Sequence, residues 1–344
     1  MTELNETYDV VVLGGGAAGL NGALMLARSR RSVAVIDAGS PRNAPADGVH
    51  GLLAREGMSP LELLERGRAE VRGYGGHVVD GRVVGVDRVR SAESGVGTDD
   101  SSAGDVSATA HDFRVHLEDG RVVSARRILV TTGLADELPE VTGLREQWGH
   151  GVLHCPYCHG WEVRDQRIAI LASGPMSVHQ ALLFSQLSDD IVFLTHTAPA
   201  LSTEDAEKLV ARGISIVDGE VTEVLSTDGA LSGVRLADGT VIARDALVVA
   251  PRMNTRATFL TDLGLTPEPH PSGMGDHIPA DPAGRTAVPG VWIAGNATDP
   301  SAQVGAAAAA GAMAGAQINA ELVMAETAQA VAAFRGATGV GVTV

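Results

Sequence analysis

The chain has 344 residues, of which 44% are hydrophobic but only 3% aromatic, so its cores must be built from aliphatic side chains. Its formal net charge of −16 at pH 7 disfavours nucleic-acid binding, because an acidic surface repels phosphate backbones. Acidic rather than basic residues precede the first apolar run, and the apolar stretch 304–316 is too short to span a bilayer. We therefore expect a soluble, cytoplasmic protein of one large domain or two smaller ones.

Residues 9–37 contain a strand, a glycine-rich turn, a helix and a second strand. The apolar run Val10–Leu13 leads into a G-x-G-x-x-G motif at 14–19, and Val33–Ile36 forms the second apolar run. This context is typical of a dinucleotide-binding βαβ unit. Asp37, at the end of the second strand, would accept hydrogen bonds from a ribose hydroxyl and repel a 2′-phosphate.

The motif at 14–19 predicts a distinct role for each glycine. Gly14 would permit the tight turn, Gly16 would let a pyrophosphate approach the backbone, and Gly19 would let helix and strand pack closely. Ala17 and Ala18 open the helix, whose N-terminus would meet the negative phosphates.

Residues 168–195 repeat this layout with an altered turn. The motif at 172–177 is Ala-x-Gly-Pro-x-Ser, and a helix is expected with Pro175 at its start. Pro175 removes a backbone N–H that a phosphate would use, and Thr195 stands at the place of Asp37. We predict that this unit kept its fold and lost nicotinamide-dinucleotide binding; the alternative is a variant turn that still binds.

The repeat predicts an α/β protein with two tandem doubly wound dinucleotide-binding-type domains. Each copy is followed by a β-rich segment with two Asp-Gly pairs that indicate hairpin turns: Asp80-Gly81, Asp119-Gly120, Asp218-Gly219 and Asp238-Gly239. The final strand and helix need a host, so residues 1–134 and 252–344 would form one domain, with 135–251 inserted in it. The polar stretch 91–107 is expected to be a surface insertion.

Two cysteines lie in the run His154-Cys155-Pro156-Tyr157-Cys158-His159. The C-x-x-C spacing lets the sulfurs form a disulfide and favours a reactive thiolate, and the flanking histidines can donate and accept protons near neutral pH. Two alternatives stay open: a zinc site, although no second C-x-x-C exists, and buried inert cysteines.

Near the C-terminus, Gly295 and Asn296 follow a strand, and Gln303 and Val304 open a long Ala-rich helix. The N-terminus of this helix could stabilise negative charge on a flavin ring. The alternative is an ordinary buried helix, packed closely through Gly311 and Gly315.

Together these motifs resemble the low-molecular-weight thioredoxin reductases over nearly the whole chain. That resemblance implies an FAD domain formed by 1–134 and 252–344, a dithiol-bearing NADPH-type domain at 135–251, and a homodimer. The departures are His159 and Asn296, where those reductases have aspartates, and the altered second turn. They are similar instead to the thioredoxin-reductase-like dithiol oxidases of holomycin- and gliotoxin-type natural products, above all in the Cys-Pro-Tyr-Cys-His-Gly-Trp run.

The resemblance implies an FAD-dependent oxidase that converts a small-molecule dithiol to a disulfide. His159 would deprotonate a substrate thiol, Cys155 would be attacked, Cys158 would pass electrons to the flavin, and molecular oxygen would leave as hydrogen peroxide. FAD would contact the residues at the glycine turn and at the C-terminal helix, namely Gly14, Gly16, Ala17, Ala18, Gly19, Asp37, Gly295, Asn296, Gln303 and Val304. The alternatives are an NADPH- or ferredoxin-dependent thioredoxin-type reductase and a non-catalytic flavin/dithiol-binding redox module.

Overall fold

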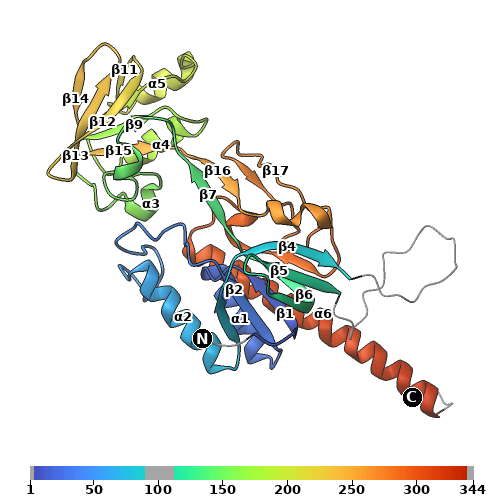
Figure 1. Ribbon diagram of the computed structural model, residues 1–344. Coiled ribbons are helices and arrows are strands. Elements are labelled where there is room, and N and C mark those ends of the chain that lie inside the picture. The colour runs from blue at the N-terminus through green and yellow to red at the C-terminus, as the bar shows by residue number, and fades with distance from the viewer. Residues whose placement is uncertain (1–3, 90–111, 339–344) are drawn as a thin grey trace.

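The computed structural model describes residues 4–89 and 112–338; the expected insertion at 91–107 lies outside them. Figure 1 shows two lobes joined by a narrow connection. The first lobe holds the N-terminal βαβ unit and the C-terminal helix, and the second holds the cysteine pair. Among the described residues, no helix combines the length and apolarity that a membrane span requires.

The first lobe is built on a seven-stranded sheet. Its strands are β1 (Thr7–Leu13), β2 (Val33–Asp37), β3 (His77–Asp80), β4 (Val83–Arg88), β5 (Phe113–Leu117), β6 (Val122–Val130) and β19 (Val291–Ile293). The path runs β3-β2-β1-β6-β5-β4, and β19 pairs in parallel with the last residues of β6. Side chains of β1 alternate between two buried cores, one on each face of the sheet, as expected for a parallel sheet covered on both sides.

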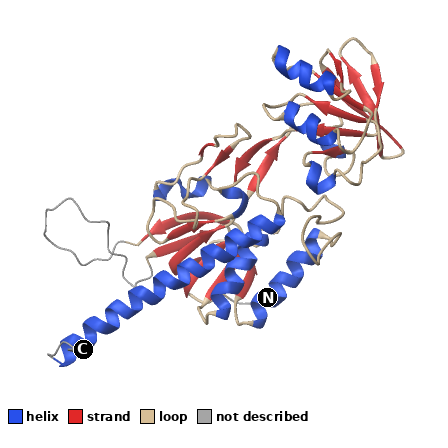
Figure 2. Cartoon of the chain, turned by 180° about the vertical axis from the view of Figure 1, so that it is seen from behind, coloured by secondary structure: helices blue, strands red, loops and turns tan. Residues whose placement is uncertain are grey.

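Three helices pack on this lobe: α1 (Ala17–Arg28), α2 (Pro60–Gly73) and α6 (Val304–Thr338). Figure 2 shows α6 running along the lobe and on past it. The backbones of α1 and α6 approach closely, because a Cβ at Gly315 would lie 2.6 Å from the carbonyl oxygen of Gly22. A Cβ at Gly311 would collide with the carbonyl oxygen of Ala18.

The second lobe repeats the first in a reduced form. Its parallel sheet runs β11 (Ser215–Val217), β10 (Ile191–Leu194), β9 (Ile168–Leu171), β15 (Ala246–Val249), β8 (Val152–Leu153), beside an antiparallel sheet of β12 (Val221–Thr227), β13 (Ala230–Leu236) and β14 (Val241–Ala243). Its helices are α3 (Pro156–His159), α4 (Ser177–Phe184) and α5 (Thr203–Ala211). Leu13 pairs with Ile36 in the first lobe and Leu171 with Leu194 in the second, so the two βαβ units share one register. The predicted fold class is confirmed.

The lobes are connected by two strands that pair with each other. The chain leaves the first lobe through β7 (Leu134–Glu137) and returns through β16 (Arg252–Thr255), and these strands are antiparallel. The predicted domain boundaries fall at these two strands and stay a prediction. Short elements complete the first lobe: β17 (Glu268–Pro269), β18 (Asp276–His277) and the 3₁₀ turns 258–263 and 295–297; a further 3₁₀ turn at 145–147 follows β7.

Two local predictions are wrong in part. Asp119-Gly120 and Asp238-Gly239 do turn antiparallel hairpins, but Asp80-Gly81 and Asp218-Gly219 connect strands that do not pair with each other. There the dipeptide instead carries the chain from the edge of a parallel sheet into an antiparallel ribbon. The helix of the second unit begins at Ser177, so Pro175 belongs to the turn before it.

Candidate functional site

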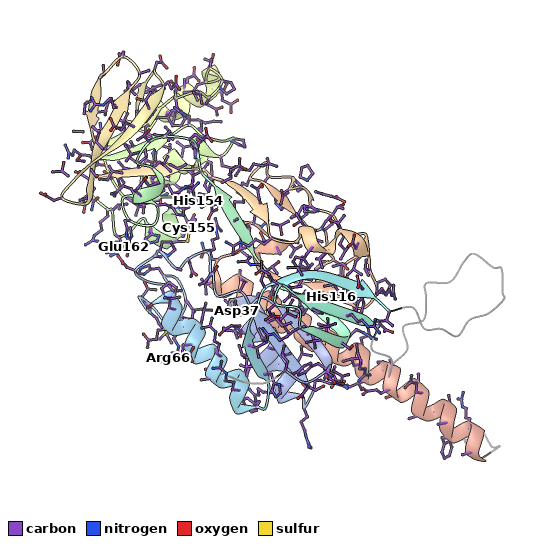
Figure 3. The ribbon with its side chains drawn as sticks, in the orientation of Figure 1. Asp37, Arg66, His116, His154, Cys155 and Glu162 are labelled. Carbon is purple, nitrogen blue, oxygen red and sulfur yellow. A yellow bond between two sulfur atoms is a disulfide. The ribbon has the colours of Figure 1, made fainter. Side chains whose placement is uncertain are left out.

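The predicted site residues converge on one cavity of about 840 Å³ between the lobes. In Figure 3, Asp37 lies at the end of β2, while His154 and Cys155 lie on the side of the second lobe that faces the first. Twelve of the thirteen predicted residues line the wall: Gly14, Gly16, Ala17, Ala18, Asp37, Cys155, Cys158, His159, Gly295, Asn296, Gln303 and Val304. Gly19 does not line it and lies behind the turn.

The geometry of the turn at 14–19 explains each glycine. Gly14 has a φ of 108°, a left-handed conformation that favours glycine. At Gly16 an added Cβ would meet no atom within 4 Å, so the backbone is open to the cavity. At Gly19 an added Cβ would collide with the carbonyl oxygen of Gly14, because helix and strand are in contact there. The turn thus presents bare backbone and the N-terminus of α1 to the cavity, an arrangement suited to a pyrophosphate.

Asp37 is buried at the end of β2 and is held on two sides. Arg68 of α2 donates a hydrogen bond of 2.7 Å to one carboxylate oxygen, and the backbone N–H of Gly39 donates one of 3.2 Å to the other. A Cβ at Gly15 would lie 2.6 Å from this carboxylate, so the turn and Asp37 fit only with glycine at that position. Sequence reasoning missed Arg68, because nothing in the spacing along α2 singles it out.

Thr132 places another polar group on the cavity wall. The hydroxyl of Thr132, just after β6, is buried without a hydrogen-bond partner among the residues that the structure describes. Because buried polar atoms are nearly always paired, an unpaired hydroxyl on a cavity wall indicates a ligand partner.

Asn296 organises the loop before α6. Its amide nitrogen lies 3.0 Å from the carbonyl oxygen of Asp299, 3.3 Å from that of Pro300 and 2.9 Å from that of Ala302. The amide has two N–H donors, so one hydrogen must be shared between two of these carbonyl oxygens. An ionised aspartate has no donor and would not hold the same loop. Gln303 and Val304, which follow this loop, bring the N-terminus of α6 to the cavity wall.

The two cysteines form a disulfide in the wall of the cavity. Cys155 precedes the single turn of α3 and Cys158 lies within it, and their Cα atoms are 5.3 Å apart. Within the described ranges, no group of three or more His, Cys, Asp or Glu side chains is arranged to hold a metal ion.

Both histidines that flank the cysteines line the cavity, and burial lowers the pKa of each. For His159, the charge of Glu162 works against this effect. For His154, the positive charge of Arg42 adds to it. His154 is also fixed in place, because Gln180 of α4 donates a 2.8 Å hydrogen bond to its backbone carbonyl. Neutral imidazoles are therefore favoured beside the disulfide, and His159 is the less constrained of the two.

A third histidine on the cavity wall was missed by sequence reasoning. His50 comes from the loop between β2 and α2 and lines the same cavity. Its ring centroid lies 6.5 Å from that of His159, its Nδ1 lies 2.6 Å from Glu56, and its Nε2 lies 3.6 Å from Glu162. Figure 3 shows Glu162 beside this loop, where the lobes meet.

The glycine turn of the second lobe is closed by its own side chains. The backbone N–H groups of Ser173 and Gly174 both donate hydrogen bonds of 3.2 Å to the hydroxyl of Ser177, which is 2% exposed. These are the groups that a pyrophosphate would use in an intact turn, and Pro175 supplies no N–H. The residues of this turn therefore do not fit a dinucleotide as those of the first turn do.

Comparisons with known proteins agree with this geometry. Residues 8–316 match the family model described as pyridine nucleotide-disulphide oxidoreductase. Thioredoxin reductase sirT of Leptosphaeria maculans is 29% identical over 341 residues, covering 95% of this chain and 98% of its own. Thioredoxin reductase tcpT of Claviceps purpurea is 27% identical over 299 residues, covering 85% of this chain and 87% of its own.

Solved structures give the same result. The crystal structure of HlmI has a TM-score of 0.87 at 42% identity and covers 98% of this chain and 99% of that chain. An oxidoreductase from Agrobacterium tumefaciens has a TM-score of 0.81 at 32% identity, over 92% of this chain and 99% of that one. With the cysteine pair and the glycine turn on one cavity, these matches show that the chain belongs to the pyridine nucleotide-disulphide oxidoreductase family, as a thioredoxin-reductase-like flavoprotein.

Proposed function

We propose that this protein is an FAD-dependent oxidase that converts a small-molecule dithiol to a disulfide, with molecular oxygen as acceptor and hydrogen peroxide as product. The observation that carries the proposal is the position of Cys155, Cys158 and His159 in the wall of the cavity that the glycine turn at 14–19 opens into. A thiol pair and a dinucleotide bound in this cavity would be neighbours.

The residues of the first lobe fit FAD. The turn at 14–19 would hold the pyrophosphate, Asp37 the ribose, and the N-terminus of α6 the flavin end, while the unpaired hydroxyl of Thr132 would gain a partner. When bound, FAD would supply the two-electron acceptor and the site of oxygen reduction.

The side chains of the second lobe perform the thiol chemistry. His159, kept neutral by burial, accepts the proton of a substrate thiol at an imidazole nitrogen. The resulting thiolate attacks the sulfur of Cys155, and the electron pair of the broken disulfide passes to the sulfur of Cys158. The second substrate thiol then gives up its proton to a base and attacks the substrate sulfur held on Cys155. That mixed disulfide breaks, its electron pair passes to the sulfur of Cys155, and the product leaves as a disulfide.

The closed second turn supports oxygen, rather than a pyridine nucleotide, as the electron-exchange partner. With the N–H groups of Ser173 and Gly174 bonded to Ser177, a phosphate would have to displace a buried side chain. The Cys-Pro-Tyr-Cys-His-Gly-Trp run supports a natural-product dithiol as substrate, in biosynthesis or self-protection, because it is similar to that of the holomycin-type enzymes.

We also propose a homodimer. Along α6, the side chains of Met313, Met324 and Val331 are exposed by 52%, 68% and 41%. Burial of such apolar surface against a second copy would be favourable. Light scattering coupled to size-exclusion chromatography measures the mass in solution, and a monomer at micromolar concentration would refute this assignment.

An anaerobic stopped-flow experiment tests the function. Dithiothreitol is expected to bleach the flavin of the purified protein rapidly and NADPH to leave it yellow. Admission of oxygen should then restore the colour and release peroxide. Cys155→Ser and Cys158→Ser should each abolish bleaching by the dithiol while the protein stays yellow. Rapid bleaching by NADPH would instead establish a reductase, and a colourless protein that cannot be loaded with FAD would refute the proposal.

A further inference from the structure

Oxidation of a dithiol releases two protons, one from each thiol, and this inference rests on the proposed function. His159 can hold only one of them. We propose that His50, supported by Glu56, accepts the second proton, so that the first lobe supplies one base and the second lobe the other.

His50 is placed for this task by contacts on two sides. The bond between its Nδ1 and Glu56 is 2.6 Å long, and the other carboxylate oxygen of Glu56 accepts a 3.0 Å hydrogen bond from the N–H of Gly51. The loop therefore fixes the carboxylate, and the carboxylate fixes the ring with Nε2 turned toward Glu162 of the second lobe. A carboxylate behind Nδ1 stabilises the imidazolium that forms when Nε2 takes a proton.

The surroundings of His50 also make it a better acceptor of the second proton than His154, the other histidine on the cavity wall. The side chain of His50 is partly exposed, at 21%, and its two ring nitrogens face the carboxylates of Glu56 and Glu162. Asp47 and His150 also act electrostatically on the neighbouring His159. His154 is instead bound through Gln180 and faces Arg42, which disfavours its protonation. Hydrogen bonding from His50 lowers the pKa of Glu56, as expected for a carboxylate that stays ionised beside an imidazole.

The two bases act in two balanced steps. In the first, one substrate thiol gives its proton to His159, its sulfur bonds to Cys155, and the pair from the Cys155–Cys158 bond passes to Cys158 as thiolate. In the second, the other substrate thiol gives its proton to His50 and bonds to the first substrate sulfur. The mixed disulfide breaks and its electron pair passes to Cys155. The substrate loses two electrons, the protein disulfide gains them, and one proton rests on each histidine.

The two assignments differ in the intermediate that accumulates. FAD-loaded protein is mixed anaerobically with dithiothreitol at about pH 6, where a free thiol of pKa about 8.5 is almost wholly protonated and depends on a base. Acid-quenched samples are read by mass spectrometry for the mixed disulfide on Cys155. His50→Gln should form it at the wild-type rate and lose it about 100-fold more slowly, so the adduct accumulates. His159→Gln should form it slowly and accumulate none.

Two further variants complete the test. Glu56→Gln should also accumulate the adduct, to a smaller extent, because it weakens the base without removing it. The matched control is His116→Gln. His116 also pairs with a carboxylate, that of Asp87 at 2.7 Å, but on the paired strands β4 and β5 and away from the cysteine pair. His116→Gln should match the wild type. If the mixed disulfide decays in His50→Gln as fast as in the wild type, the inference is wrong. If the wild-type protein forms no mixed disulfide and leaves dithiothreitol unoxidised, the proposed function itself is wrong.

Discussion

Replacement of Asn296 by aspartate tests how the loop before α6 is held. The amide nitrogen donates to three carbonyl oxygens at 3.0, 3.3 and 2.9 Å, and an ionised carboxylate can donate to none of them. The amide has two hydrogens, so loss of two hydrogen bonds at roughly 1 kcal/mol each lowers the free energy of unfolding by about 2 kcal/mol. For a lobe of this size that corresponds to a fall in melting temperature of about 5 °C.

Differential scanning calorimetry is the suitable assay, because the two lobes need not unfold together. Asn296→Asp should lower the transition of the first lobe only. The matched control is Asn319→Asp. Asn319 accepts a hydrogen bond of 2.8 Å from Arg31, so an aspartate keeps this bond and should not lower stability. A carboxyl group among carbonyls has a raised pKa in the folded state, so folding takes up a proton and the defect of Asn296→Asp should shrink as pH falls. Equal melting of Asn296→Asp and wild type at neutral pH would refute this account of the loop.

Three other substitutions have defined outcomes. Gly19→Ala should cost about 1–3 kcal/mol and reduce bound flavin, measured by visible absorbance, because its methyl group collides with the Gly14 carbonyl. Burial lowers the pKa of His159, so the rate of dithiol oxidation should stay high down to below about pH 6.5 and fall at lower pH, where the imidazole is protonated. His159→Gln should slow the reaction about 10²–10⁴-fold and remove this fall in rate at low pH. A hydrogen bond from Arg167 lowers the pKa of Asp245 to about 2, so this half-exposed pair stabilises the fold above about pH 4 and no longer does so at about pH 2. Denaturant unfolding of Asp245→Asn should show a loss in the free energy of unfolding below about 1 kcal/mol at neutral pH and none at about pH 2.

The glycine turn and the cysteine pair could be predicted because their geometry is local. The roles of Gly14, Gly16 and Gly19 depend on one backbone conformation and on contacts within a single βαβ unit, so six residues contain the information. The repeat of this unit then predicted the register shared by Leu13 and Leu171.

The remaining site residues depend on tertiary contacts that no spacing reveals. His50 is more than a hundred positions from Cys158, and a histidine in a polar loop has no periodic partner in the sequence. Thr132 matters only because its hydroxyl is left unpaired in the folded wall. Ser177 was visible in the altered motif, but its bonds to two backbone N–H groups require the fold of the turn. The Asp-Gly pairs show that a local motif can also be ambiguous. The same dipeptide forms a hairpin turn at two places and connects strands that do not pair with each other at two others.

The close approach of α1 and α6 has an electrostatic consequence. Each helix carries about half a positive charge at its N-terminal end, and both of these ends lie on the wall of the cavity. The backbones of the two helices are in contact at Gly22, Gly311 and Gly315, where there is no room for a Cβ atom. This contact fixes the distance between the two helices and so between their partial charges. Replacement of any of these three glycines by alanine would push the helices apart and weaken the electric field that they exert on an anion in the cavity. None of the three glycines lines the cavity itself.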